Sequence, residues 1–182
     1  VVVDPRRDCD VYVERLMREG MRLTHILETH RNEDYVIGST ELVARTGATI
    51  LHSSGGAFQY GYGEDIKDGD KITVGRLQLE ALHTPGHAPG HMSYLLSTPS
   101  GTPWVLFSGD ALFAGDVGRT DLAGPDFATA NARVLYDRTF RRILPLGDGV
   151  ILCPAHGPAS ARGAAMSDRL WTTLGIVRRR QP

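Results

Sequence analysis

The sequence predicts an α/β fold whose strand ends carry a metal centre. Apolar runs at 105–107 and 150–153 each lead into a tight turn containing Gly or Pro, which is typical of buried strands. Other strand-like runs alternate along the chain with segments of helical pattern. Four strand-end turns bear metal-capable side chains, namely His30, His87, Asp110 and His156. Because a sheet holds its strand ends in fixed relation, these side chains are expected to form one metal centre.

The expected elements alternate between helix and strand from the first residues onward. They are a helix over 8–20, a strand over 23–27, a helix over 40–46 closed by Gly47, a strand pair over 71–74 and 76–82, and a helix over 127–144. The first helix places Val13, Leu16 and Met17 on one face. The core contacts expected from the last helix are Val134, Leu135, Ile143 and Leu144.

Composition favours one domain. The 182 residues are 41% hydrophobic, enough for one sizeable core, so a single domain over 1–182 is expected, with 164–182 as a C-terminal helix or tail. The formal net charge of -1 gives no broad electrostatic footprint for nucleic acid. No apolar run approaches the ~20 residues of a membrane span. Cys9 and Cys153 are too few for a disulfide framework, so a reducing, cytoplasmic setting is expected.

The series of turns resembles the metallo-β-lactamase superfamily over about residues 1–163. The resemblance implies an αββα sandwich, with two mixed sheets face to face and helices outside. Within the superfamily, Gly118-Arg119-Thr120-Asp121 and the stretch from Thr84-Pro85-Gly86-His87 to Tyr94 resemble the persulfide dioxygenase branch, which includes bacterial fusions to rhodanese domains. The chain begins in a strand without a Met, whereas family members have an earlier hairpin, so the first strands are expected to be missing.

The first metal motif departs from the family pattern. The superfamily has His-x-His-x-Asp-His, and residues 30–35 read His-Arg-Asn-Glu-Asp-Tyr. A dinuclear zinc hydrolase uses the second His on one metal and the last His on the other, so Asn32 and Tyr35 weaken both sites. Full two-zinc hydrolysis is therefore not expected.

The persulfide dioxygenase branch instead binds one iron through three ligands, which carry over to His30, His87 and Asp110. Two imidazoles and one carboxylate with open positions form the facial arrangement expected of non-haem Fe(II) oxygen chemistry. Three protein ligands leave about three of six octahedral positions for a substrate sulfur and O2. The resemblance therefore implies one Fe(II) per chain and oxidation of a low-molecular-weight persulfide, above all glutathione persulfide, to sulfite.

Two residues near these ligands have alternative roles. His156 would hold the second metal in a hydrolase, and the iron interpretation makes it a hydrogen-bond or proton-transfer group of the pocket. Asp34 is a leftover ligand, or it orients His30 or binds backbone at a helix start.

The stretch after Asp110 offers a substrate-binding residue. The Arg that matches Arg119 in the persulfide dioxygenase branch helps to hold the glutathione part of the substrate, because its planar fork suits a carboxylate. The alternative is a surface ion pair with Asp116 or Asp121. Asp121 could also accept a hydrogen bond from a ligand imidazole and fix its tautomer.

His91 and His83 flank His87 at four residues on either side. His91 could face the pocket or substitute as a ligand, although His87 is preferred because it ends the motif turn. His83 lies in an alternating strand and is expected to be structural.

Two rival functions stay open, as do the partners. One rival is a zinc hydrolase of thioesters or lactones, similar to hydroxyacylglutathione hydrolase, and the other is a degenerate, non-catalytic member. The implied reactants are a small-molecule thiol or persulfide and O2. A rhodanese domain or sulfurtransferase partner and homo-oligomer formation are not decided by the sequence.

Overall fold

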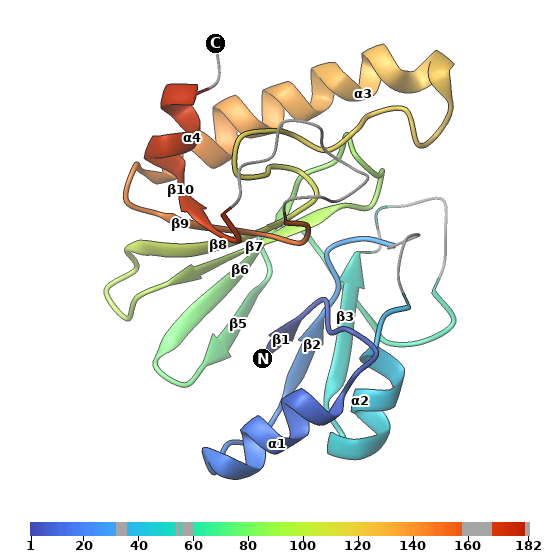
Figure 1. Ribbon diagram of the computed structural model, residues 1–182, viewed down its shortest axis with the longest axis vertical. Coiled ribbons are helices and arrows are strands. Elements are labelled where there is room, and N and C mark those ends of the chain that lie inside the picture. Colours follow the sequence, from blue (N-terminus) through green and yellow to red (C-terminus); the bar gives the residue numbers. More distant parts are fainter. Residues whose placement is uncertain (32–35, 54, 56–59, 158–168, 181–182) are drawn as a thin grey trace.

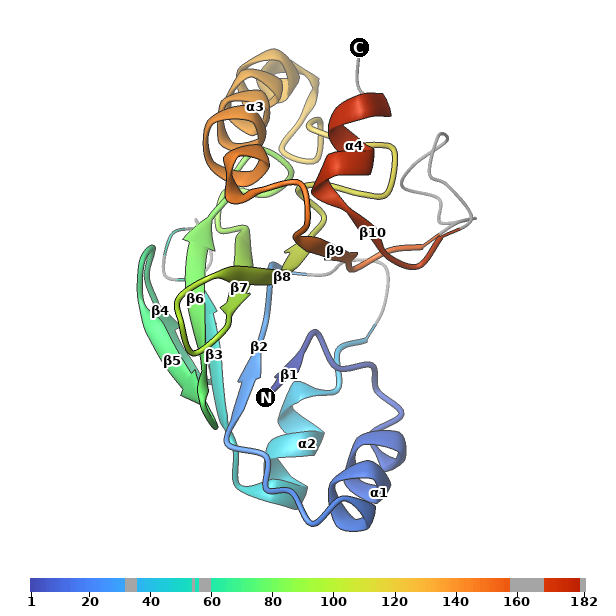
Figure 2. The same cartoon turned by 90° about the vertical axis from the view of Figure 1, so that its left-hand side faces the viewer.

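The computed structural model describes residues 1–31, 36–53, 55, 60–157 and 169–180, except the side chain of Arg180. Two sheets pack face to face with helices outside them (Figure 1). Helices α1 and α2 lie beside the first sheet, and Figure 2 shows α3 and α4 beside the second. This arrangement confirms the expected αββα sandwich. None of the described helices combines the length and apolarity needed to cross a membrane.

The first sheet has the order β1-β2-β3-β4, and its described strands pair in parallel. Its strands are β1 (Val2–Val3), β2 (His25–Leu27), β3 (Thr49–Ser53) and β4 (Glu64–Ile66). Parallel neighbours need crossovers, and α1 (Asp10–Arg18) supplies the one from β1 to β2 and α2 (Ser39–Thr46) the one from β2 to β3. As predicted, α2 ends at Gly47, which has φ +68°.

The second sheet has the order β10-β9-β8-β7-β6-β5 and is mixed, because β8 and β9 pair in parallel within an otherwise antiparallel sheet. Its strands are β5 (Lys71–Val74), β6 (Leu77–His83), β7 (Met92–Ser97), β8 (Pro103–Gly109), β9 (Ile151–Pro154) and β10 (Thr172–Thr173). The chain crosses from β8 to β9 through α3 (Pro125–Arg138), and α4 (Leu174–Arg180) follows β10.

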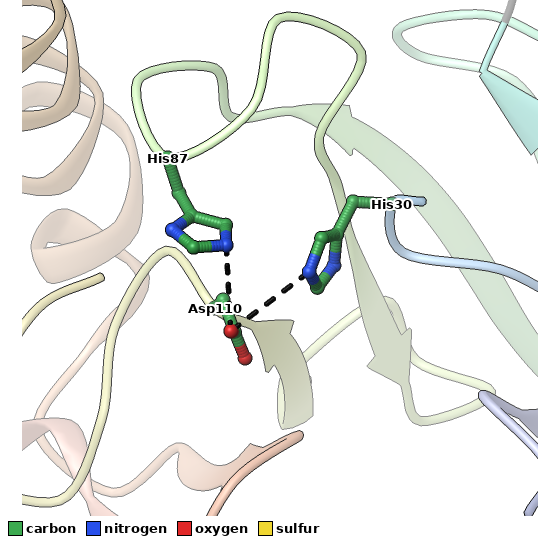
Figure 3. A group of neighbouring side chains, drawn as sticks. All are labelled: His30, His87 and Asp110. Atoms are coloured by element: carbon green, nitrogen blue, oxygen red, sulfur yellow. Dashed lines mark ion pairs between the residues drawn. The ribbon is translucent and has the colours of Figure 1, made fainter. Parts of the chain in front are cut away.

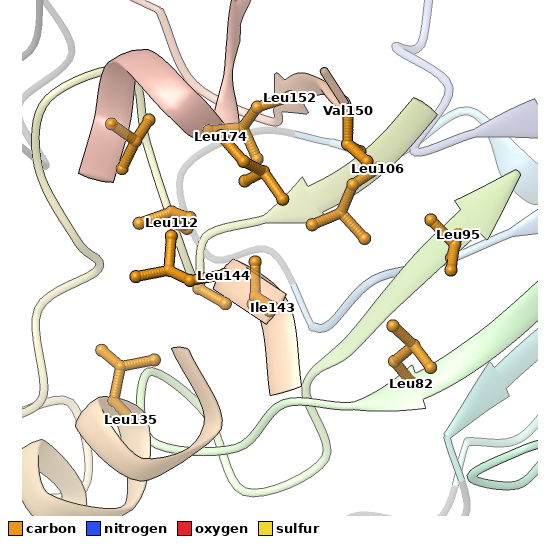
Figure 4. Packing of buried hydrophobic residues seen from close by; sticks show 12 residues of the cluster. Leu82, Leu95, Leu106, Leu112, Leu135, Ile143, Leu144, Val150, Leu152 and Leu174 are labelled. Atoms are coloured by element: carbon orange, nitrogen blue, oxygen red, sulfur yellow. The ribbon is translucent and has the colours of Figure 1, made fainter. Parts of the chain in front are cut away.

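Three buried clusters hold the layers together. The cluster under α1 and α2 contains Cys9, Leu23, Ile26, Leu42, Ala48 and Ile50. The cluster between the sheets contains Leu27, Ile66, Leu79, Ala81, Met92 and Tyr94. The cluster under α3 and α4 includes Leu82, Leu106, Leu135, Leu152 and Leu174 (Figure 4). The second sheet therefore has apolar packing on both faces, which fixes the ends of β8 and β9.

Three details of the predicted helices are wrong. Met17 is 76% exposed, whereas Val13 and Leu16 pack against the sheet as expected. Val134 is 40% exposed, and Leu135 is the buried neighbour. The helix expected over 127–144 stops being α-helical at Arg138 and continues as a π-helical turn over 139–143 and a 3-10 turn over 144–146. This change of helical pitch still buries Ile143 and Leu144, which confirms them as core contacts.

Two hydrogen bonds tie the segment after β2 to the second sheet. The Tyr94 hydroxyl donates to the Glu28 carbonyl at 2.8 Å, and the Met92 backbone N–H donates to the Thr29 carbonyl at 2.7 Å. Tyr94 is fully buried, so these bonds are shielded from water. They hold the residues just before His30 against the edge where β8 ends.

Gly86 sets the close approach of α3 to the turn that carries His87. Its φ is +129°, and a Cβ there would lie 2.5 Å from Leu135 Cβ and 2.8 Å from the Asn131 carbonyl oxygen. A side chain at this position would therefore be strained and would also push α3 away from the turn.

Gly86→Ala is expected to lower the free energy of unfolding more than Gly147→Ala. Gly147 has a similar φ of +119°, but a Cβ there would meet nothing within 4 Å, so its substitution carries only the backbone strain of about 1–3 kcal/mol. Urea unfolding of the two variants measures the difference. Equal losses would show that α3 does not press on this turn.

Candidate metal centre

Three side chains from three separate segments converge at one edge of the sandwich. His30 follows β2, His87 lies in the loop between β6 and β7, and Asp110 directly follows β8. One possible ligand atom from each lies within 4.8 Å of the others, and all three residues are buried. The distances to Asp110 Oδ2 are 3.4 Å from His87 Nε2 and 3.8 Å from His30 Nε2 (Figure 3). The structure thus brings the three predicted ligands together.

The His87 ring is oriented by its other nitrogen. His87 Nδ1 donates to the Arg119 carbonyl at 2.9 Å, because a carbonyl oxygen can only accept. This bond fixes the tautomer in which Nε2 carries the lone pair and faces Asp110. Gly118 lets the loop come this close, since a Cβ there would lie 1.9 Å from the Asp110 carbonyl oxygen and 3.0 Å from His87 Nδ1.

The His30 ring is oriented by a relay that ends at a carboxylate. His30 Nδ1 lies 2.9 Å from Thr29 Oγ1, and Thr29 Oγ1 donates to Asp4 Oδ2 at 2.7 Å. Since the threonine proton goes to Asp4, its oxygen accepts from His30 Nδ1, and His30 Nε2 again carries the lone pair. Both imidazoles therefore direct a lone pair toward the Asp110 carboxylate.

Asp4 is a functional residue that the sequence analysis missed. It accepts the Thr29 backbone N–H at 2.8 Å, and its own φ is +45°. Burial raises the pKa of Asp4 to about 7, against the lowering effect of the Thr29 hydrogen bonds. Repulsion by Glu28 and Asp110 raises it further. The sequence does contain a signal for Asp4: it directly follows the apolar run 1–3, just as the predicted ligands follow their strands.

Asp110 uses its second carboxylate oxygen to hold His156. His156 Nδ1 lies 2.6 Å from Asp110 Oδ1, so one oxygen faces the imidazoles of His30 and His87 and the other faces His156. His156 is 13% exposed at its side chain and lines a cavity of about 380 Å³ together with Thr29 and Gly109. This location suits a hydrogen-bond or proton-transfer group.

His91 lies inside the protein beside the three ligands. Its Nε2 accepts the Asp110 backbone N–H at 2.9 Å, and its Nδ1 lies 2.9 Å from Thr84 Oγ1. Burial, and to a lesser degree the neighbouring His30 and His87, holds the pKa of His91 well below its usual value, so the ring is neutral. The geometry does not support the option that His91 substitutes as a ligand, because both ring nitrogens are engaged within the protein.

Arg119 and Asp121 form the ion pair that was one of the two predicted alternatives. Arg119 Nε and Nη2 donate to the two Asp121 carboxylate oxygens at 2.7 and 2.8 Å, with both side chains about half exposed. The Arg119 hydrogen bonds lower the pKa of Asp121 to about 2. The prediction that Asp121 fixes a ligand tautomer is wrong for His87, whose Nδ1 donates to the Arg119 carbonyl instead.

The structure confirms the structural role expected for His83, and it does not describe Asp34. His83 Nε2 lies 2.9 Å from the Pro89 carbonyl oxygen and the His83 backbone N–H donates to Asp68, which are structural contacts. Asp34 lies outside the described residues, as do Asn32 and Tyr35.

Comparison with known proteins defines the family. The profile of the Metallo-beta-lactamase superfamily matches residues 1–156. Given this match, and the fold and ligand positions above, the chain belongs to the metallo-beta-lactamase superfamily.

Within the superfamily the chain is similar to proteins of two activities. It is 32% identical over 160 residues to the mitochondrial persulfide dioxygenase ETHE1 of Homo sapiens, covering 86% of this chain and 58% of that protein. It is 36% identical over 101 residues to the hydroxyacylglutathione hydrolase of Rhodospirillum rubrum, covering 55% of this chain and 38% of that protein. The crystal structure of ETHE1 from Myxococcus xanthus superposes with a TM-score of 0.80 at 31% identity, covering 99% of this chain and 71% of that one. The chain thus spans little more than half the length of the human relative.

The buried charge of Asp4 is expected to make the stability of the metal-free protein depend on pH. The folded chain holds the Asp4 proton with a pKa of about 7, against 3.8 as its ordinary value. The resulting stabilisation is complete below pH 4 and is lost as the pH rises to about 7, since the folded state binds more protons than the unfolded state in that window.

Urea unfolding of the metal-free protein and of Asp4→Asn at pH 5, 6 and 7 tests this expectation. The free energy of unfolding should fall more steeply with pH in the parent protein than in the variant, which carries no titrating group at this position. Identical slopes would show that Asp4 titrates normally in the folded state.

Proposed function

We propose that this chain is a mononuclear non-haem Fe(II) dioxygenase that oxidises a low-molecular-weight persulfide, glutathione persulfide above others, to sulfite. The observation that carries the proposal is the donor set of His30, His87 and Asp110, which converge with one lone-pair nitrogen or carboxylate oxygen each. Two imidazoles and one carboxylate with open positions are typical of Fe(II) enzymes that use O2. Among the described residues, this is the one group of His, Cys, Asp and Glu close enough to hold an ion.

The donor set favours one ion over two. The sequence has Asn32 and Tyr35 where the family motif has its second and last His, which removes two donors for a second metal. Among the described residues, His30, His87 and Asp110 form the one group close enough to hold an ion, and His156 lies beside this group at Asp110 without belonging to it.

The relatives include both activities. Persulfide dioxygenases align with 86% of this chain at 32% identity, and hydroxyacylglutathione hydrolases align with 55% to 100% of it at 26% to 36% identity. The relatives are compatible with either candidate, so the choice of the dioxygenase rests on the donor set and on the residues at 32 and 35.

Each residue has a role in the proposed reaction. When bound, iron would supply the binding and activation of O2 beside the substrate sulfur. His30, His87 and Asp110 would hold the ion and leave its other positions open, and all three side chains are buried. His156, hydrogen-bonded to Asp110, can accept a proton from the reaction. The Arg119 guanidinium is half exposed and paired with Asp121, and it can exchange Asp121 for a carboxylate of glutathione.

The proposed reaction balances without a further reductant. The outer sulfur of the persulfide gives four electrons to O2, and the S–S bond breaks. Water supplies the third oxygen of sulfite, so the products are the parent thiol, sulfite and two protons. A sulfurtransferase or rhodanese domain is the class of partner that would supply the persulfide, and a reducing cytoplasm would keep the thiol product reduced. Homo-oligomer formation is compatible with this function and is not required by it.

The second candidate is a zinc-dependent hydrolase of thioesters or lactones. The 36% identity over 101 residues to a hydroxyacylglutathione hydrolase favours it, and two imidazoles with one carboxylate also suit Zn(II) and leave a position for water. This function would need no O2, which separates the two candidates experimentally.

Elemental analysis of anaerobically purified protein, run beside O2 consumption with glutathione persulfide, tests the proposal. We expect about one iron per chain and persulfide-dependent O2 uptake, with both lost in His30→Ala and Asp110→Ala. His25→Ala is the matched control, because His25 lies on β2 and contacts Thr24 instead of the site.

Other outcomes would contradict the proposal in distinct ways. Zinc alone, with thioester or lactone hydrolysis and no O2 uptake, would move the hydrolase to first place. Substoichiometric metal with neither activity would identify a degenerate member.

A further inference from the structure

His91 contacts all three segments that bear the proposed ligands. Its Nε2 accepts the backbone N–H of Asp110 at 2.9 Å. Its ring stacks on the His30 ring, with centroids 5.0 Å apart and planes at 29°. Its carbonyl accepts the Thr84 backbone N–H at 2.9 Å, which closes the loop that carries His87. His91 is fully buried, so these contacts are made without competition from water.

The hydrogen bonds around His91 have one possible direction. The Asp110 backbone N–H can only donate, so His91 Nε2 carries the lone pair and Nδ1 carries the proton. Nδ1 therefore donates to Thr84 Oγ1 at 2.9 Å, and Thr84 donates to Ser93 Oγ at 2.8 Å. Ser93 in turn donates to the Ser108 carbonyl at 3.3 Å. The chain of bonds starts and ends on the turn 108–110, so it clamps that turn at both sides of Gly109.

The turn packs closely against the His91 ring at Gly109. A Cβ on Gly109 would lie 2.6 Å from His91 Nε2 and 2.7 Å from Thr29 Oγ1. The backbone at Gly109 is therefore packed between the His91 ring and the threonine that orients His30. A displacement of His91 would move the Asp110 carboxylate relative to both imidazoles.

We propose that His91 is the positioning residue of the metal centre: as a hydrogen-bond acceptor at Nε2, it holds the Asp110 backbone so that the carboxylate meets His30 and His87. The inference rests on the ligand set of the proposed function, and it is independent of the metal's identity and of persulfide oxidation. His91 does not touch the ion and is not a ligand. Its contribution is measured as metal affinity.

Two polar substitutions separate this role from packing. In Gln the side-chain oxygen reaches the place of Nε2, so His91→Gln keeps an acceptor for the Asp110 N–H. In Asn the oxygen reaches only the place of Nδ1, so His91→Asn can contact Thr84 and leaves the Asp110 N–H unsatisfied. Both variants carry the same amide group, and circular dichroism with thermal unfolding establishes that each is folded.

The measurement is Zn(II) affinity by competition with a chelator, with the visible spectrum of bound Co(II) as a report on coordination geometry. We expect His91→Gln to bind Zn(II) with near-parental affinity and to keep the Co(II) spectrum. His91→Asn should bind about 10–100-fold more weakly, with a changed spectrum, because partners that orient ligands typically contribute this much. His52→Gln and His52→Asn are matched controls, since His52 is also buried but bonds the Tyr62 carbonyl.

The hydroxyl at Thr84 provides a second test that leaves His91 in place. Thr84→Ser keeps the acceptor that holds the proton of His91 on Nδ1. Thr84→Val removes this acceptor, so the tautomer with the proton on Nε2, which cannot accept the Asp110 N–H, is no longer disfavoured. Only Thr84→Val should therefore weaken Zn(II) binding, whereas the glutamine oxygen in His91→Gln accepts in any case. This pair decides the matter if the His91 variants do not fold.

Two results would overturn the inference. Equal Zn(II) affinities in His91→Gln and His91→Asn, together with loss of binding in Asp110→Ala, would reject the positioning role alone. Parental affinity in Asp110→Ala and His30→Ala would reject the ligand set and the positioning role with it.

Discussion

The burial of the Asp110 carboxylate is the constraint on which the rest of the site depends. Asp110 is 1% exposed and sits where β8 ends. A buried carboxylate is costly unless it is paired or binds a metal. The protein surrounds it with His30 and His87 at one oxygen and with His156 at the other. A divalent ion held between His30, His87 and Asp110 would compensate the charge of the carboxylate.

Two further acids, Asp4 and Glu28, lie near Asp110 and add to the negative charge at this edge of the sandwich. Asp4 and Glu28 lie close enough for their negative charges to act on each other, and burial raises the pKa of both. Three acids gathered around one edge of the sandwich make a site that is unfavourable when empty of positive charge. A bound cation would relieve the repulsion among them, so metal binding and folding stability are expected to be linked.

The architecture supplies the precision that such a site needs. Each ligand follows a different element, and independent contacts fix each position: Tyr94 and Met92 hold the segment before His30, α3 packs on Gly86 beside His87, and His91 holds Asp110. These contacts come from the second sheet and its covering helix. The core around β8 and β9 therefore determines the geometry of the metal centre.

Strand-end turns leave a local signal in the sequence, and they predicted an α/β fold with a metal centre at the ends of its strands. The resemblance to the metallo-β-lactamase superfamily then implied the layered fold and the three ligands. Thr84-Pro85-Gly86-His87 and Gly109-Asp110 each follow an apolar run that ends in a turn residue. The contacts that orient the ligands leave no such signal. The acceptor of His87 is a backbone carbonyl of Arg119, and the partner of His91 is a backbone N–H of Asp110. Residue types do not reveal backbone partners from distant segments. The structure was therefore needed to show that His91 accepts from the Asp110 N–H, and that the Arg119 carbonyl takes the place beside His87 that was expected for Asp121. The wrong prediction for Val134 has a similar cause, because helical periodicity marks a face while tertiary packing decides which of two adjacent apolar residues is buried.

X-ray absorption spectroscopy of the anaerobically iron-loaded protein tests the central claim most directly. The account predicts one Fe(II) with scattering from two imidazoles, the remaining near neighbours being oxygen, and no metal–metal vector. A metal–metal vector of about 3.5–4 Å, as two-metal sites show, would contradict it.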